Sequence, residues 1–282
     1  MKILLVIFFL IIGCTKKNGT APSEGELPST NPETPPSEVV PAPPAVVLLP
    51  GSNIGIQPSW VPQFSNIVLS NSLQTSSAIS NGAVLISAVG TNAVINDLNL
   101  SNINPALGTS GGGLIFDGVD DSVSFGDSSA YQITSDITIS MWYRKNSESS
   151  DWSRLIGKGD STNRNYGIWE HPGVGRNLLV QIYCVSSVCL NMNSVGLIDV
   201  GIWYHISMVR SGSSISLYIN GVLDSTSTLS GIPKTSTDPL TVGWSFHGFQ
   251  NMSAGETTIW NTGLSASEVL TVFNYQKSAF GL

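Results

Sequence analysis

Three glutamates are the residues with which this chain could hydrolyse a glycosidic bond. A retaining hydrolase needs two carboxylates about 5 Å apart, one as nucleophile and one as acid and base. Glu170 and Glu256 each lack a second acid two or four residues away on the same predicted strand, and Glu148 falls in a polar loop. The sequence therefore predicts no enzyme. A glycoside hydrolase whose carboxylates come together from separate strands is kept as an alternative.

A cluster of aspartates lies between two short apolar runs. Asp117-Gly118 and Asp120-Asp121 fit a tight turn, in which Gly118 supplies a positive φ and the carboxylates accept hydrogen bonds from the backbone. Clustered carboxylate oxygens are also the ligands that Ca²⁺ prefers. The turn is the favoured interpretation, and calcium held by Asp117, Asp120 and Asp121 is the alternative.

The 3 cysteines divide into one near the start of the chain and a pair, Cys184 and Cys189. The four residues between them can reverse the chain, so the thiols are predicted to meet across neighbouring strands in a structural disulfide worth roughly 2 kcal/mol. A redox or metal role is disfavoured because the two-residue spacing and an adjacent histidine are missing. His171, His205 and His247 lie far apart in sequence, so no zinc site is expected either.

The remaining cysteine, Cys14, ends an apolar run that follows Lys2. A charged start, a short apolar core and small residues at the cut make a secretory signal, too short for a stable membrane span. The ending Ile11-Ile12-Gly13-Cys14 resembles the lipobox of bacterial lipoproteins. The resemblance implies cleavage before Cys14, a diacylglycerol thioether on its sulfur and acylation of its amino group, which together anchor a protein stably in a lipid bilayer.

This interpretation makes residues 1–14 a lipoprotein signal peptide and the protein exported and lipid-anchored. In lipoproteins an Asp straight after the cysteine implies retention at the inner membrane. The residue here is Thr15, so the outer membrane or the cell surface is the expected location. An ordinary signal peptide whose cysteine happens to lie near the cut is the alternative.

Composition fits an exported protein and excludes nucleic acid as a partner. Charged residues make up only 11% of the chain, and its formal net charge is −7. Loss of Lys2 with the signal would make the chain still more acidic. No run of basic residues is present to neutralise phosphates, so nucleic-acid binding is not expected.

Residues 15–60 are predicted to form a tether. Up to about residue 50 this segment is rich in proline among Ser, Thr, Glu and Gly, with almost no aromatic content, and it cannot build a core. A semi-extended chain of this kind reaches at most about 100 Å. Residues 51–80 are ambiguous: Trp60, Phe64 and Ile67-Val68-Leu69 could form an added strand of the sandwich or an apolar end of the tether.

The rest of the chain, residues 61–282, reads as short strands separated by Gly, Asn, Asp and Ser. Residues 136–144 alternate apolar and polar side chains with the period of a strand, and residues 202–210 and 215–222 are two more strands. Asn220-Gly221 is a strong hairpin signal because both residues tolerate positive φ. Ser265, followed by Glu268, predicts the capped start of one short helix.

Several motifs then occur in the order seen in laminin-G-like domains of the concanavalin A-like lectin and glucanase superfamily. They are Gly113-Leu-Ile-Phe-Asp-Gly-Val-Asp-Asp-Ser-Val123, Ile137-Thr-Ile-Ser-Met-Trp142, Leu155-Ile-Gly-Lys-Gly159, Gly201-Ile-Trp-Tyr-His-Ile206, Leu217-Tyr-Ile-Asn-Gly-Val222, Leu240-Thr-Val-Gly243 and Ile259-Trp-Asn-Thr-Gly-Leu-Ser265. Together with the ending of the chain, the resemblance covers about residues 80–282. It implies an all-β fold, a two-sheet antiparallel jelly-roll sandwich, which the strand pattern also predicts.

The resemblance also bears on site residues. Related domains often bind calcium, and their acidic pair before the last strand appears here as Gly255-Glu256, so Glu256 is added to the possible calcium ligands although one carboxylate is missing. Trp142, Trp203 and His205 lie inside strand motifs. A role in the core or an interface is favoured for them over ligand contact.

Binding is therefore the predicted activity, at loops on the rim of the sandwich. Aromatic side chains there can stack on a sugar ring and polar ones can bond its hydroxyls, although each aromatic residue could instead plug an end of the core. The candidates are Trp152, Asn163, Asn165, Asn177, Phe246, His247, Phe249 and Asn251. The sequence thus predicts a membrane-anchored surface lipoprotein that presents a lectin-like domain to a glycan or protein ligand. A purely structural envelope or appendage subunit is the main alternative.

Overall fold

The computed structural model describes residues 46–47, 60–73, 82–96, 104–105 and 113–282. All of them belong to one compact unit, Pro43–Leu282. Cys14 and most of the predicted tether lie outside the described residues. No helix within the described residues combines the length and apolar character needed to cross a membrane.

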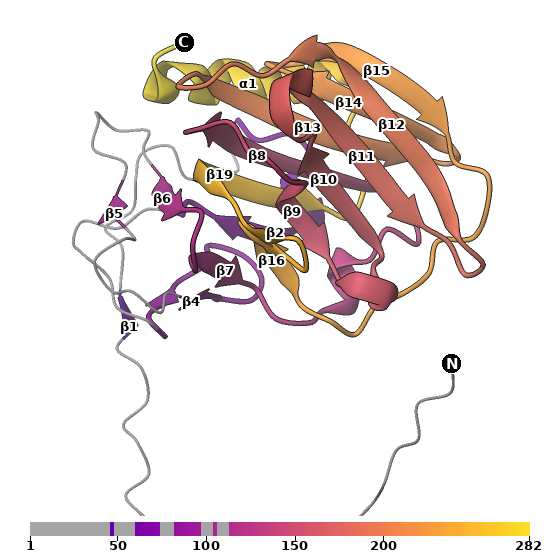
Figure 1. The fold of residues 1–282 in the computed structure, drawn as a ribbon. Coiled ribbons are helices and arrows are strands. Elements are labelled where there is room, and N and C mark those ends of the chain that lie inside the picture. Colours follow the sequence, from indigo (N-terminus) through magenta and orange to yellow (C-terminus); the bar gives the residue numbers. More distant parts are fainter. Residues whose placement is uncertain (1–45, 48–59, 74–81, 97–103, 106–112) are drawn as a thin grey trace, which may run out of the picture. The chain divides into compact units, whose positions relative to one another are not determined.

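The described residues form a sandwich of two main, largely antiparallel sheets, as predicted from the sequence (Figure 1). The nine-stranded sheet contains, in spatial order, β1 (Val46–Val47), β3 (Val84–Leu85), β4 (Ala93–Asn96), β7 (Ser122–Ser124), β16 (Leu240–Val242), β9 (Ser153–Lys158), β10 (Tyr166–Glu170), β11 (Asn177–Tyr183) and β12 (Val188–Leu197).

The eight-stranded sheet packs against it. Its strands are β15 (Val222–Thr228), β14 (Ser214–Ile219), β13 (Trp203–Ser211), β8 (Ile137–Lys145), β19 (Asn251–Trp260), β6 (Leu114–Asp117) and β5 (Asn104–Pro105), with β2 (Ile67–Asn71) also paired to β19. A small hairpin joins β17 (Trp244–Ser245) to β18 (Gly248–Phe249). The helices are α1 (Ala266–Gln276) and the 3₁₀ turns Phe64–Asn66, Ser129–Tyr131, Ser161–Asn163, Gly173–Gly175 and Lys277–Phe280.

Strand β8 explains how the core is built. Its alternate residues Ile137, Ile139, Met141 and Tyr143 all enter the core between the sheets. The intervening row is buried as well, because the C-terminal segment covers it: the Trp142 ring stacks on Phe280 with 4.0 Å between centroids. Burial on both faces suits a central strand of the eight-stranded sheet.

Trp142 and His205 occupy this covered face. The indole Nε1 of Trp142 donates to Gln276 Oε1 at 2.8 Å, and His205 shares a 2.7 Å hydrogen bond with Ser140. Burial lowers the pKa of His205 to about 3, so its ring is neutral at physiological pH. Trp203 is half-buried and meets Phe280 edge to face. All three residues therefore have the structural roles favoured from the sequence.

Two local signals are confirmed. Asn220 and Gly221 both have positive φ, 52° and 76°, and connect β14 to β15 in a two-residue hairpin. Ser265 and Glu268 form a reciprocal capping box at the start of α1. Both depend only on residues close in sequence, which is why the sequence predicts them well.

The ambiguous segment before residue 80 contributes a strand. Residues of β2 pair with the second half of β19, while β6 pairs with its first half. The ring of Trp60 stacks on Tyr275 of α1 at 4.8 Å, and β1 lies within the segment predicted as tether. The folded unit thus includes residues ahead of position 61.

The outermost strands β12 and β15, one from each sheet, lie against each other (Figure 1). The carboxylate of Asp224 in β15 accepts hydrogen bonds from the backbone N–H groups of Val195 and Gly196 in β12, at 2.8 and 2.6 Å. This contact fastens the two sheets along that edge.

Candidate functional site

The outer face of the nine-stranded sheet carries a hollow of about 270 Å³. Along β11, Leu178, Val180 and Ile182 enter the core, so the intervening residues point to the other face. We call this site the aromatic hollow and define it by the residues that line it: Trp152, Arg164, Trp169, Leu179, Gln181, Tyr183 and His247.

Paired glycines shape the floor of the aromatic hollow. Gly157 of β9 lies opposite Gly167 of β10 in the register of the sheet. A Cβ atom on Gly167 would lie 2.5 Å from Nε1 of Trp169, and one on Gly157 would lie 2.6 Å from Cδ of Arg154. The absence of side chains at both positions therefore lets the indole and the arginine lie flat on the sheet.

Arg154 supports the Trp169 ring from below. Its guanidinium carbon lies 5.4 Å from the ring centroid, and its Nη2 donates to Thr241 Oγ1 at 2.9 Å. Nη1 also lies 3.7 Å from a carboxylate oxygen of Asp160. Burial lowers the pKa of Arg154 to about 10, which still leaves it charged at neutral pH. Arg154 thus holds the floor of the site in place.

Arg164 forms one wall of the aromatic hollow. Its guanidinium carbon lies 4.2 Å from the ring centroid of Tyr183, 4.8 Å from that of Phe246 and 5.7 Å from that of Trp169. Nε donates to the carbonyl of Ser161 at 2.9 Å. Burial lowers the pKa of Arg164 from its ordinary value, so the cation is partly stripped of water.

The rim is built by loops. The Trp152 ring lies 4.3 Å from that of His171, and Nδ1 of His247 lies 3.7 Å from a carboxylate oxygen of Asp151. Phe246 projects beside the hollow with 46% of its surface exposed. Exposed rings next to hydrogen-bonding groups can contact both the apolar face and the hydroxyls of a sugar.

Three of the predicted ligand residues gather here: Trp152 and His247 line the hollow, and Phe246 contacts Arg164. The prediction for Asn165 is wrong, because its side chain is fully buried, accepts a hydrogen bond from the Ile133 N–H at 2.8 Å and donates to the carbonyl of Lys234. An amide committed in this way holds the loop rather than a ligand.

The other predicted ligand residues lie outside the residues that line the hollow. Asn163 makes a 3.5 Å contact with Thr237, and Asn177 donates to the carbonyl of Ser194 at 2.8 Å. Phe249 pairs with Trp244 in the β17–β18 hairpin, and Asn251 pairs with Asp117 in the sheet. Closeness to a loop in sequence does not bring these four side chains to the site.

Sequence reasoning missed Arg164, Trp169, Leu179, Gln181 and Tyr183. The last three are alternate residues of β11 and are less apolar as a group than the core residues between them. This alternation could have predicted that they lie on the outer face of the sheet. The contribution of Arg164 depends on how the loop before β10 folds back over β11, which no local pattern indicates.

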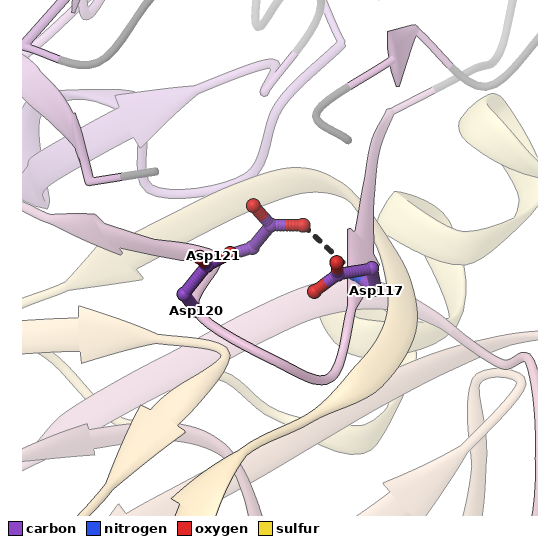
Figure 2. A group of neighbouring side chains, drawn as sticks. All are labelled: Asp117, Asp120 and Asp121. Atoms are coloured by element: carbon purple, nitrogen blue, oxygen red, sulfur yellow. Dashed lines mark hydrogen bonds between the residues drawn. The ribbon is translucent and has the colours of Figure 1, made fainter. Parts of the chain in front are cut away.

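The aspartates between β6 and β7 form the predicted turn, and Figure 2 shows them together. Gly118 has a φ of 83°. The Asp117 N–H donates to Asp121 at 2.8 Å, and Asp117 accepts from the Val119 N–H at 2.7 Å. One carboxylate oxygen from each of Asp117, Asp120 and Asp121 lies within 4.8 Å of the others. The turn is confirmed, and calcium there stays a prediction.

Glu256 does not join these aspartates, so its addition to a calcium site is wrong. The register of β19 shifts between Ala254 and Thr257, and the Glu256 side chain is buried, where it accepts hydrogen bonds from Ser70 at 2.9 Å and Thr258 at 3.4 Å. Burial raises its pKa to about 7. The irregular pairing of β19 directs this carboxylate into the protein.

Two glutamates, Glu148 of a loop and Glu170 of β10, do meet around Lys145. Its Nζ forms ion pairs with both Glu148 and Glu170, and Glu170 also accepts a hydrogen bond from the Tyr143 hydroxyl. Burial and the Glu170 charge hold the pKa of Tyr143 well above its ordinary value. Since a lysine separates the carboxylates and Glu170 is fully buried, this is not the open, facing pair that glycoside hydrolysis needs.

The predicted disulfide is present. Cys184 and Cys189 are bonded, with 5.6 Å between their Cα atoms, at the connection between β11 and β12. The bridge closes this hairpin close to the Tyr183 end of the aromatic hollow. It is a structural link, as expected.

A sandwich of two largely antiparallel sheets with this strand order has a lectin-like fold. The sequence pattern of the laminin-G-like group of the concanavalin A-like lectin/glucanases superfamily matches residues 117–270, and the chain belongs to this superfamily. No curated protein matches the chain.

Solved structures with the same fold include binding domains and enzymes. The binding domain of Paraclostridial Mosquitocidal Protein 1 has 20% sequence identity and a TM-score of 0.58 over 74% of this chain and 52% of that one. Trypanosoma rangeli sialidase has 17% identity and a TM-score of 0.56 over 78% of this chain and 34% of that one. The chain thus spans about half or a third of these proteins, and the likeness is one of fold alone.

Proposed function

We propose that this protein is a lipid-anchored surface protein that recognises a glycan through the aromatic hollow. The observation that carries the proposal is the hollow itself, where the rings of Trp152, Trp169 and Tyr183 lie beside the polar groups of Arg164 and Gln181. Aromatic faces next to a few fixed hydrogen-bonding groups are typical of small-ligand sites. A protein ligand is the second possibility considered for the same surface.

The anchor is argued from the start of the chain. The apolar run that ends in Gly13-Cys14 and the proline-rich segment after it suit an acylated protein whose folded unit stands away from a bilayer. Such a protein is exported and lies at the outer membrane or cell surface. Its partners would be the lipid bilayer at Cys14 and a glycan at the hollow.

We further propose that the protein is not a hydrolase. The two glutamates that approach each other share Lys145, and Glu170 has no exposed surface with which to reach a substrate. A purely structural role through strand addition is also disfavoured, because Asp224 occupies backbone N–H groups on the outermost strand β12.

A glycan array probed with residues 43–282, the compact folded unit, with and without calcium, tests recognition. Trp152→Ala and Phe246→Ala are expected to weaken binding about tenfold each, since each removes a stacking surface. Tyr275→Ala is the matched control, because Tyr275 is an exposed aromatic residue of α1, outside the hollow. Equal loss in all three variants would contradict the assignment of the hollow as the binding site.

Cys14→Ser in the full chain tests the anchor. We expect the unaltered protein to incorporate labelled fatty acid and to sediment with membranes, and the variant to do neither. Fatty-acid labelling that persists in Cys14→Ser would contradict the anchor and would leave the binding result unaffected.

A further inference from the structure

Arg164, in the wall of the aromatic hollow, forms no ion pair, whereas several other buried or half-buried cations of the described residues do. Ion pairs are formed by Lys145 with Glu170, Arg154 with Asp160, Lys158 with Asp127 and Arg176 with Asp199. Within the described part of the chain, no carboxylate lies within ion-pair distance of Arg164. The wall of the aromatic hollow therefore carries a positive charge that the protein does not neutralise by direct contact.

Asp160 is the acidic residue whose charge acts on Arg164, but its carboxylate contacts other groups. Asp160 lies 3.7 Å from the guanidinium of Arg154, and it accepts a 3.3 Å hydrogen bond from the backbone N–H of Phe246. Asp160 therefore acts on Arg164 through its charge and forms no ion pair with it.

The surrounding rings set the orientation of this cation. Tyr183 and Phe246 lie closest to the guanidinium carbon, at 4.2 and 4.8 Å. Nε donates to Ser161, and Nη1 donates to Gln181 Oε1 at 3.3 Å. Nη2 has no acceptor among the described residues and Nη1 uses one of its two N–H groups, so three of the five guanidinium N–H donors have no partner within that part of the protein.

A planar guanidinium with free donors matches a carboxylate, which accepts two parallel hydrogen bonds from it. At about 270 Å³, the hollow lies just below the usual range for sites of drug-sized molecules. It suits one or two sugar rings better than a folded protein surface. The flat rings of Trp152 and Phe246 provide the stacking surfaces that a sugar ring needs and an acidic peptide does not.

We infer that the aromatic hollow selects saccharides that carry a carboxylate, with Arg164 as the residue that binds the carboxylate. This inference rests on the proposed glycan recognition and adds the chemical class of the ligand. His247, which also lines the site, is placed to bond the ring hydroxyls. The Gln181 amide accepts from Arg164 and donates to Asn191, so it orients the cation.

Two matched pairs of probes test the inference by calorimetric titration. Digalacturonic acid is compared with its dimethyl ester, and sialyllactose is compared with lactose. In each pair only the acidic member presents a carboxylate. We expect the acidic member to bind at least about tenfold more tightly at low salt, with the difference shrinking as salt is raised.

Arg164→Gln is expected to abolish the preference, and Arg164→Lys to keep part of it, because lysine retains the charge without the planar pair of donors. Arg176→Gln is the matched control: Arg176 is half-exposed, is paired with Asp199 and is not among the residues lining the hollow. The ratio between acidic and neutral probes is measured on one sample of each variant, so it does not depend on the fraction that is folded.

The outcomes separate this inference from the proposed function. Equal binding of acidic and neutral saccharides, or an unchanged ratio in Arg164→Gln, overturns the inference and leaves glycan recognition intact. A hexaglutamate peptide that binds as tightly as digalacturonic acid also overturns it, in favour of acidic protein segments. No binding of any saccharide, acidic or neutral, overturns both proposals.

Discussion

Lys145 of β8 and Glu170 of β10 form an ion pair in which neither side chain has any exposed surface. The two strands belong to different sheets, so this pair joins the two layers of the sandwich. Hydrogen bonds that Lys145 donates to Glu148 and Glu170, with the charges of these two residues, outweigh the effect of burial and raise the pKa of Lys145. A charged link in the interior is stable only while both partners are present.

Removal of either partner should destabilise the protein strongly. Lys145→Ala leaves Glu170 buried without its cation, and the expected loss in the free energy of unfolding is about 3–5 kcal/mol. The double variant Lys145→Ala with Glu170→Gln should lose less stability than the sum of Lys145→Ala and Glu170→Gln alone, because no buried charge is then left uncompensated. Urea unfolding monitored by tryptophan fluorescence measures all three.

Lys277→Ala is the control for these variants, because Lys277 bonds only to groups on the surface of the C-terminal segment. It should change the free energy of unfolding by less than about 1 kcal/mol. A similar decrease in the free energy of unfolding in Lys145→Ala and Lys277→Ala would show that the buried pair contributes no more to stability than a surface contact.

Glu256 should make stability depend on pH. Its pKa is about 7 in the folded protein, raised by burial from an ordinary 4.5. Below the ordinary value the group is neutral in both states. As the pH rises toward 7 the unfolded chain releases the proton first, so the stability falls across this window and then levels off.

Glu256→Gln should remove this dependence and make the protein more stable than the unaltered form at pH 8 by at most about 3 kcal/mol. At pH 4 the two should be nearly equal. Thermal unfolding between pH 4 and pH 8 measures the difference. Glu268→Gln is the control: burial of Glu268 is outweighed by hydrogen bonds from Ser265 and Gln63 that lower its pKa, so its effect has the opposite sign.

The disulfide should stabilise the fold modestly. Cys184 and Cys189 close a short ring, for which the chain-entropy argument gives roughly 2 kcal/mol. Cys184→Ser with Cys189→Ser should therefore lower the melting temperature by roughly 4–8 °C for a domain of this size. A reducing agent should reproduce the shift in the unaltered protein and have no effect on the double variant.

The aspartate turn should depend on Asp121 whether or not calcium is added. The Asp121 carboxylate accepts a 2.8 Å hydrogen bond from the Asp117 N–H and is fully buried. Asp121→Ala should cost about 1–3 kcal/mol. Differential scanning calorimetry in a chelator and in millimolar calcium distinguishes the alternatives. A rise in melting temperature with calcium that Asp120→Asn abolishes would establish the metal site instead.

The sequence predicts best what short stretches decide. The alternation from Ile137 to Tyr143 and the pair Asn220-Gly221 depend on neighbours a few residues away, and both are confirmed. The errors come from contacts between distant segments. Asn165 reads as a loop amide available to a ligand until the Lys234 carbonyl is found beside it. Glu256 reads as a possible calcium ligand until Ser70 of β2 is found to donate a hydrogen bond to it.

The same limit explains the aromatic hollow. Trp152 could be named from its type and loop position, but its neighbours on β10 and β11 depend on the strand order of the nine-stranded sheet. Even a correct list of strands does not show that Gly157 lies opposite Gly167, because this depends on the register between β9 and β10. A register shift of one residue would turn the Trp169 side chain into the core.

The hydrogen bonds from Val195 and Gly196 to Asp224 have a consequence for crowded surroundings. Where copies of a protein meet often, an outermost strand with open backbone groups is a template on which they can polymerise. Because the Asp224 carboxylate accepts hydrogen bonds from two of those N–H groups, it blocks the addition of another strand at this part of β12. Even at high concentration, copies of the folded unit should therefore not join edge to edge through this part of β12.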